Sequence, residues 1–130
     1  MTETEYLVDT SAWIEYFLGT ALGQRVRNIM EEKGSTFYVP GVVITELVSA
    51  LMRNGHDPIP CWEFLVSSAT FIDTLPQDCA DAGVKHAELK KTHNRISYTD
   101  ALLLVLSEKR KMKIISKDEH LKGKNTIMLR

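Results

Sequence analysis

This 130-residue sequence contains little glycine and little proline. With 7 glycines and 4 prolines, it has too few of either for a collagen-like, low-complexity or disordered chain. The apolar fraction of 44% and the charged fraction of 25% are those of an ordinary globular protein. Since the length falls within the usual range of one domain, we expect residues 1–130 to form a single domain with one core.

Cysteines and long apolar runs are also scarce. Cys61 and Cys79 belong to no CxxC or Cys/His motif, so the sequence predicts neither a disulfide framework nor a cysteine-ligated zinc site, and we expect both thiols to be reduced and buried. No apolar run approaches the ~18 residues that span a bilayer. The first residues are acidic where a secretory signal is basic. We therefore expect a cytoplasmic protein without a membrane partner.

The net charge of -1 conceals a strong asymmetry along the chain. Through Gly83 there are 4 basic and 12 acidic residues, a net charge of -8, whereas from Val84 onward there are 12 basic and 5 acidic residues, a net charge of +7. Such separation is compatible with an anionic partner on the basic side, and equally with a surface whose halves neutralise each other. Charge therefore permits a nucleic-acid partner without requiring one.

Short β-prone runs alternate with helical patterns along the whole chain. We expect strands at 6–8, 37–39, 71–72, 112–115 and 126–129, and helices at 12–18, 22–30, 42–52, 76–92 and 97–110. A further helix opens at Asp57-Pro58, and its expected core face is Trp62, Leu65, Val66 and Ala69. Because each crossover between parallel strands needs a helix, this alternation predicts an α/β fold with helices on both faces of a parallel sheet.

Two acidic residues follow predicted strands. Asp9 comes directly after the strand at 6–8, and Asp118 lies in the turn after the strand at 112–115. Ligands of parallel sheets bind beyond the carboxyl ends of the strands, so both side chains are expected in the ligand crevice. Each also has a purely structural interpretation, because Asp is a strong N-cap for the helix or turn that follows.

Two further acids belong to predicted helices. Glu46 lies three residues after Val43 and four before Ala50, which places its carboxylate on an apolar face, where it needs a cation, an arginine or a water-filled cavity. The alternative is that its side chain extends past the helix edge into solvent. Asp100 ends the capping-box pattern Ser97-Tyr98-Thr99-Asp100, ahead of the apolar run 101–106. We expect a nearly all-buried helix with Asp100 in its first turn.

A hard cation is the physical reason to gather four carboxylates. Without one, the four charges would repel each other and raise their own pKa values, whereas Mg²⁺ or Mn²⁺ prefers carboxylate oxygens and waters. One or two such ions can orient a phosphodiester, activate water and stabilise the leaving oxygen during hydrolysis. Three hydroxyls are candidates to support a ligand, although turn and cap roles explain them more simply: Thr10, Ser11 and Ser116.

The four acids stand in segments that resemble the PIN-domain family, in particular its small VapC-like toxin branch. The segments are Val8-Asp9-Thr10-Ser11, Ile44-Thr45-Glu46-Leu47, Ser97-Tyr98-Thr99-Asp100-Ala101-Leu102 and Ile115-Ser116-Lys117-Asp118. Each is short, but their order and spacing cover essentially the whole chain. The departures are mild, with Ser116 where the family often has Thr and Leu121 where Phe is frequent.

This resemblance implies a Mg²⁺- or Mn²⁺-dependent endoribonuclease, with one or two ions and a five-stranded parallel sheet in a single PIN-like domain. The residues that match the family's catalytic and metal-binding acids are Asp9, Glu46, Asp100 and Asp118. Toxins of this branch cleave RNA, are held inactive by a small antitoxin protein, and are usually homodimers. We therefore expect an RNA substrate, an antitoxin partner and a homodimer.

Basic residues are candidates for RNA binding, whereas the histidines and tryptophans have simpler structural explanations. The basic second half offers four candidates that would attract the RNA backbone by charge: Arg95, Lys117, Lys122 and Lys124. The histidines are expected to be solvated surface or capping residues: His86, His93 and His120. Trp13 and Trp62 are expected in the core or at an interface rather than under a stacked base.

Two other functions remain open from the sequence. One is a phosphatase or phosphotransferase with Asp9 as nucleophile, as in haloacid-dehalogenase-like proteins. That family has a second acid two residues later, where this chain has Ser11, and the chain is short for that fold. The other is a non-catalytic module that binds a protein partner through its helices. Retention of all four acids argues against it.

Overall fold

A computed structural model describes residues 3–130, and its centre is one parallel sheet of five strands. In chain order the strands are β1 (Thr4–Val8), β2 (Ser35–Pro40), β3 (Thr70–Ile72), β4 (Lys113–Ser116) and β5 (Thr126–Met128). Their order across the sheet is β3-β2-β1-β4-β5, and all four pairings are parallel. The α/β fold with a five-stranded parallel sheet that the sequence predicts is confirmed.

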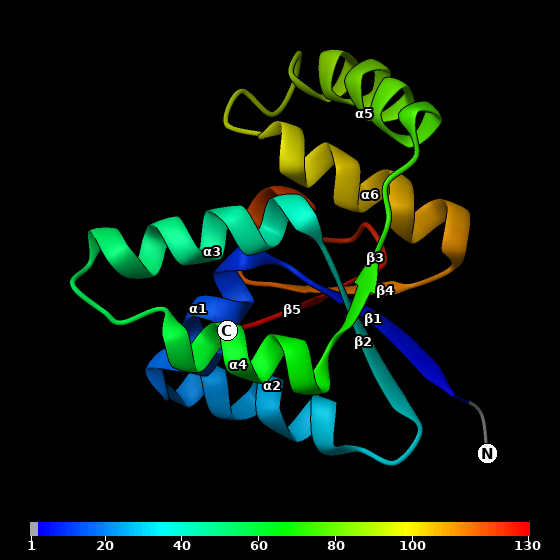
Figure 1. The fold of residues 1–130 in the computed structure, drawn as a ribbon. Coiled ribbons are helices and arrows are strands. Elements are labelled where there is room, and N and C mark those ends of the chain that lie inside the picture. Colours follow the sequence, from blue (N-terminus) through cyan, green and yellow to red (C-terminus); the bar gives the residue numbers. More distant parts are fainter. Residues whose placement is uncertain (1–2) are drawn as a thin grey trace.

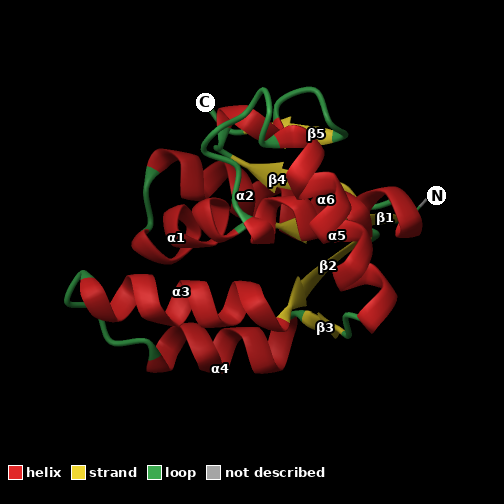
Figure 2. Cartoon of the chain, turned by 90° about the horizontal axis from the view of Figure 1, so that it is seen from above, coloured by secondary structure: helices red, strands yellow, loops and turns green. Residues whose placement is uncertain are grey.

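Within residues 3–130, six α-helices connect and cover these strands. They are α1 (Thr10–Leu18), α2 (Ala21–Glu31), α3 (Gly41–Arg53), α4 (Ile59–Ser68), α5 (Pro76–Leu89) and α6 (Tyr98–Arg110), and a 3-10 turn, η1 (Glu119–Leu121), follows β4. Figure 1 shows α5 and α6 above the sheet and α1, α2 and α4 below it. In Figure 2, α3 leaves the end of β2 and runs away from the sheet, with α4 returning beside β3. The result is a three-layer α/β/α arrangement.

Helix α6 is the buried helix that its apolar run predicts. Every residue from 99 to 107 is buried, because α5 packs along the side of α6 that faces away from the sheet. Ser97 and Asp100 form the predicted capping box at its start. The continuous apolar run therefore corresponds to a helix that is covered on both sides. The capping box places Asp100 in the first turn of this helix.

The predicted core face of α4 is right for Leu65 and Ala69 and wrong for Trp62 and Val66. Trp62 and Val66 are about half exposed, while Leu65 is fully buried and Cys61 nearly so. Phe64 is directed into the core, where its ring centroid lies 6.1 Å from that of Trp13. The apolar residues of α4 itself point to nearly all sides of the helix, so their spacing does not identify which face packs against the core.

The expectation for the cysteines is half right. Cys61 is buried on α4, but Cys79 is exposed on α5. Both are free thiols, as predicted. Cys79 is exposed because the buried face of α5 is carried by Asp78 and Ala82 instead. Within residues 3–130, no helix is both long and apolar enough to cross a membrane.

Candidate active site

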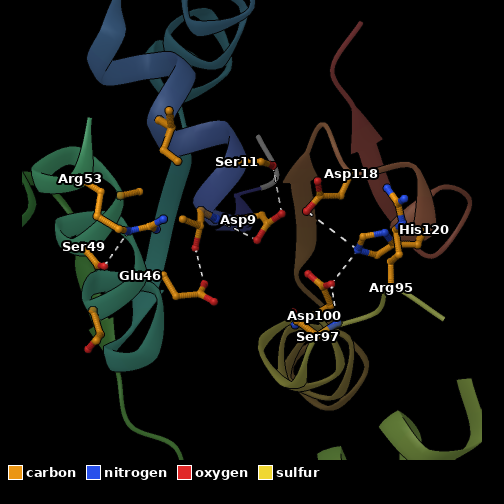
Figure 3. A pocket seen from close by; sticks show the side chains of 14 residues that line it. Asp9, Ser11, Glu46, Ser49, Arg53, Arg95, Ser97, Asp100, Asp118 and His120 are labelled. Atoms are coloured by element: carbon orange, nitrogen blue, oxygen red, sulfur yellow. Dashed lines mark hydrogen bonds and ion pairs between the residues drawn. The ribbon is translucent and has the colours of Figure 1, made fainter. Parts of the chain in front are cut away.

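A pocket of about 560 Å³ lies beyond the carboxyl ends of β1 and β4. Its walls come from the starts of α1 and α6, from α3, and from the segment after β4 (Figure 3). All four acids that the sequence singles out line it: Asp9, Glu46, Asp100 and Asp118. The structure thus brings together four carboxylates that are separated by as many as 109 positions of sequence.

Asp9 is both a helix cap and a pocket residue. It is 2% exposed and forms the N-cap of α1, where its Oδ1 accepts a hydrogen bond of 2.8 Å from the backbone N–H of Thr10. Its Oδ2 accepts hydrogen bonds from the hydroxyls of Ser116, at 2.7 Å, and Ser11, at 3.1 Å. Two of the three predicted supporting hydroxyls therefore bind this carboxylate directly.

The surroundings of Asp9 make its charged form costly. The pKa of Asp9 is raised from 3.8 to about 7, chiefly by burial. The hydrogen bond from Ser116 opposes this rise, and the nearby carboxylates of Asp118 and Asp100 contribute to it. A bound cation would remove this cost, because an opposite charge stabilises an ionised carboxylate.

Glu46 is directed into the same pocket from α3 and is held by two hydroxyls. Its Oε1 accepts a hydrogen bond of 2.7 Å from Thr10 Oγ1, and its Oε2 accepts one of 3.1 Å from Thr99 Oγ1. The third predicted hydroxyl, Thr10, thus holds Glu46. The sequence analysis does not identify Thr99 as a partner of Glu46, although its place beside Asp100 in the capping box is a usable signal.

Asp100, Asp118 and His120 form a group on the other side of Asp9 from Glu46 (Figure 3). The Nε2 of His120 lies 2.6 Å from Asp100 Oδ2 and 4.0 Å from Asp118 Oδ2. Asp100 Oδ2 also accepts a hydrogen bond of 3.0 Å from the backbone N–H of Ser97. The expectation that His120 is a solvated or capping residue is wrong, because the turn η1 aims its ring into the pocket.

The chemistry of these donors fits a divalent metal ion. Asp100, Asp118 and His120 each offer one ligand atom, all within 4.8 Å of one another, and no other such group of three occurs in residues 3–130. Carboxylate oxygens suit Mg²⁺ and Mn²⁺, and imidazole nitrogen is a common ligand of transition metals. Asp9 lies beside this group and adds a third carboxylate to the same pocket (Figure 3).

Two arginines stand at opposite sides of this acidic pocket. Arg95, a predicted RNA-backbone contact, lines it from the loop before α6, and Arg53 lines it from the last turn of α3 (Figure 3). Arg53 Nε donates a hydrogen bond of 3.2 Å to Ser49 Oγ. Throughout the described chain, neither arginine has a carboxylate oxygen within 4.0 Å. Arg53 was missed, although its helical spacing from Glu46 and Ser49 places it on their face.

The three predicted lysines lie outside the pocket lining. Lys117 forms an ion pair of 3.3 Å with Glu15, Lys124 Nζ donates to the backbone carbonyl of His120, and Lys122 is exposed. Their contact with RNA stays a prediction. His86 lies away from the pocket as expected, with its ring 4.4 Å from that of Tyr98.

Comparison with known families agrees with this geometry. The sequence profile described as "PIN domain" matches residues 6–125, nearly the whole chain. The chain therefore belongs to the PIN domain family. No curated protein sequence matches it significantly.

Solved structures with the same fold share little sequence with this chain. VapBC2 from Rickettsia felis, bound to a DNA fragment from its promoter, aligns with a TM-score of 0.72 at 14% identity over 96% of this chain and 97% of that one. VapC20 from Mycobacterium tuberculosis, a Sarcin-Ricin loop cleaving toxin, gives 0.72 at 16% identity over 96% and 98%. PAE2754 from Pyrobaculum aerophilum gives 0.69 at 20% identity over 96% and 89%. These structures are similar to this chain in fold.

Proposed function

We propose that this chain is a metal-dependent endoribonuclease and the toxin of a toxin–antitoxin pair. The observation that carries the proposal is one pocket in which Asp9, Glu46, Asp100 and Asp118 meet, with a cationic side chain on either side. Carboxylates can hold the metal ions that promote hydrolysis of a phosphodiester, and arginines can bind its phosphates.

The acids have distinct roles in this proposal. Asp9, Asp100 and Asp118 would hold one or two Mg²⁺ or Mn²⁺ ions, which supply electrostatic stabilisation of the reacting phosphate. Glu46, held by Thr10 and Thr99, faces the pocket from the opposite wall and would orient the attacking water or a second ion. The hydroxyls of Ser11 and Ser116 keep the Asp9 carboxylate in one orientation.

The substrate is proposed to be RNA bound through its backbone. Arg53 and Arg95 would bind the phosphates on either side of the cleaved one, because a guanidinium matches phosphate geometry and neither is engaged by a carboxylate in the described structure. Lys117, Lys122 and Lys124 would extend the positive field further along the strand. The description of VapC20 as a Sarcin-Ricin loop cleaving toxin supports RNA as the substrate class.

The toxin role is supported by solved structures with a similar fold. One is described as a toxin–antitoxin complex from Klebsiella pneumoniae, and others are VapBC complexes, two of them bound to DNA. By analogy with them we propose that the chain binds a small antitoxin, acts in the cytoplasm and forms a homodimer. Light scattering of the purified protein would test the homodimer. A single domain over residues 1–130 is part of the same proposal.

The nuclease activity is tested with purified protein and single-stranded RNA. Asp9→Asn combined with Asp100→Asn is expected to abolish cleavage, because both substitutions remove a metal-binding oxygen while Asn preserves helix capping. Asp73→Asn, at an exposed position outside the pocket, is the matched control and should cleave as the unmodified chain does. Cleavage by the double variant at the normal rate would refute the proposal.

The toxin role and the two other functions are tested separately. Expression of the chain should arrest growth, the double variant should not, and the protein encoded by an adjacent small gene should restore growth. Trapping of an acyl-phosphate on Asp9 would instead support a phosphotransferase. Absence of any RNA cleavage, together with partner binding by both forms, would support a binding module.

A further inference from the structure

We propose that His120 is itself a ligand of the metal ion, through Nε2, and that this nitrogen makes the site select Mn²⁺ over Mg²⁺. The inference rests on the proposed function, because it concerns the metal that the nuclease would use. The resemblance that the sequence shows involves only the four acids, and nothing in it assigns a role to His120.

His120 Nε2 forms a hydrogen bond with Asp100 Oδ2, and its distances to both carboxylates are short enough for the three side chains to share one ion. Two ligands that each lie ~2.1 Å from a metal are at most ~4.2 Å apart. The Nε2 of His120 satisfies this limit with both partners, at 2.6 Å from Asp100 Oδ2 and 4.0 Å from Asp118 Oδ2. Any ion that these two carboxylates share is therefore within reach of the imidazole.

The position of the ring is fixed by the backbone on both sides. Ahead of it, the N–H of Asp118 donates to Ser116 Oγ at 2.9 Å, and the N–H of Leu121 donates to the Asp118 carbonyl at 3.0 Å. Behind it, Leu121 is fully buried in the core. Lys124 Nζ donates to the carbonyl of His120 itself at 3.2 Å. Because the turn is held in this way, the imidazole is presented to the pocket without rearrangement of the chain.

A simple ion pair between His120 and Asp100 does not explain where the ring lies. Asp100 Oδ2 already accepts the backbone N–H of Ser97, so its capping role is complete without the imidazole. The ring lies on the side of Asp100 that faces Asp118, as Figure 3 shows. The imidazole therefore faces both carboxylates rather than Asp100 alone, which is where an ion shared by Asp100 and Asp118 would be within its reach.

A nitrogen ligand has a definite consequence for the choice of metal. Mg²⁺ is a hard cation that takes oxygen ligands and keeps several waters, whereas imidazole nitrogen binds first-row transition metals well. His120 should therefore contribute binding energy to Mn²⁺ and little to Mg²⁺. A site of carboxylates alone would not discriminate in this way.

The test uses the purified full-length chain with Mn²⁺ bound. Pulsed electron paramagnetic resonance of the ion should show coupling to one ¹⁴N nucleus, which changes to the ¹⁵N pattern when histidine is ¹⁵N-labelled. The coupling should vanish in His120→Gln, whose amide still donates to Asp100, and persist in His56→Ala, at an exposed position between α3 and α4. In titration calorimetry His120→Gln should lower Mn²⁺ affinity ~10-fold or more and Mg²⁺ affinity less than ~3-fold.

The outcomes separate this inference from the proposed function. Bound Mn²⁺ without nitrogen coupling, or equal losses of Mn²⁺ and Mg²⁺ affinity in His120→Gln, would overturn the role of His120 and leave the nuclease intact. Failure of the unmodified chain to bind either ion would overturn both. The labelling result on the unmodified chain decides the question even if the variant is poorly folded.

Discussion

The hydroxyl of Ser116 donates a hydrogen bond of 2.7 Å to Oδ2 of Asp9, across 107 positions of sequence. Asp9 directly follows β1 and Ser116 ends the neighbouring strand β4, since Val8 at the end of β1 pairs with Ile115 on β4. This contact opposes the effect of burial on the Asp9 carboxyl, so it sets how readily the pocket carries negative charge.

Replacement of this hydroxyl should raise the pKa of Asp9 further. In Ser116→Ala the carboxylate loses a donor that favours its charged form, so the pKa is expected to move above about 7. Titration of the ¹³C-labelled carboxyl by NMR measures the shift, and Ser67→Ala, at an exposed position on α4, serves as the control. An unchanged Asp9 pKa in Ser116→Ala would show that the hydrogen bond does not stabilise the anion.

The stability of the metal-free protein should depend on pH through Asp9. The pKa of this carboxyl rises from 3.8, its ordinary value, to about 7 on folding, so the folded state holds a proton that the unfolded state releases. The free energy of unfolding therefore falls as pH rises from about 4 to 7, by at most about 1.4 kcal/mol per pH unit. Asp9→Asn removes this dependence while preserving the N-cap.

Urea unfolding in the presence of a chelator measures this effect. The stability of Asp9→Asn relative to the unmodified chain should increase steadily between about pH 5 and pH 7. Added Mn²⁺ should stabilise the unmodified chain more than the variant, because Asp9→Asn removes one of the carboxylates near the ion. A relative stability that stays constant over this pH range would contradict the assigned pKa.

Each of the two arginines should contribute to RNA affinity through charge. Arg53→Gln and Arg95→Gln are expected to raise KM, with a smaller effect on kcat, and each should lower the salt dependence of RNA binding by about one phosphate contact. Arg27→Gln, on α2 outside this pocket, is the control. Binding isotherms at several salt concentrations measure the slope of the logarithm of the RNA binding constant against the logarithm of the salt concentration. An unchanged slope in both variants would exclude these contacts.

Gly23 should tolerate no larger residue. A Cβ there would lie 2.0 Å from the backbone oxygen of Glu15, because α1 and α2 cross with their backbones in contact. Gly23→Ala is expected to lower the free energy of unfolding by about 1–3 kcal/mol. Gly83→Ala, in α5 with nothing within 4 Å of the new Cβ, should be neutral or stabilising by up to ~1 kcal/mol. Equal stabilities of the two variants would disprove the close approach.

The two thiols should differ sharply in reactivity. Cys79 is exposed, whereas Cys61 is buried and burial raises its pKa to about 11. A thiol reagent at neutral pH should label one cysteine in the native protein and two in denaturant. Cys79→Ser should abolish native labelling, and Cys61→Ser should leave it unchanged. Rapid labelling of two thiols in the native chain would contradict the packing of α4.

Much of the site was predictable because its signals are local. Asp9 and Asp118 follow strands, and Asp100 belongs to a capping box, so each position was readable within a few residues. A parallel sheet sends all its strand ends to one edge, which is why four distant acids could be assigned to one pocket. Glu46 was predictable from helical spacing against Val43 and Ala50.

The remaining features depend on contacts between elements. The packed face of α4 is set by the aromatic side chains of α1, and no pattern within α4 itself specifies it. The direction of the His120 ring follows from a turn of three residues, too short to carry a periodic signal. The partners of Glu46 are threonines from α1 and α6, which only the assembled fold brings to it.

The sequence by itself determined the alternation of strands and helices, the buried helix α6 and the acids at the edge of the sheet, because strand propensity, capping and apolar periodicity act over short stretches of chain. Tertiary structure alone decided how those acids are partnered. Placing β1 between β2 and β4 brings Asp9 beside Ser116. The starts of α1 and α6 come close to α3 and bring Thr10 and Thr99 to Glu46. Distances across a pocket depend on how separate elements pack, and that packing is a property of the whole fold.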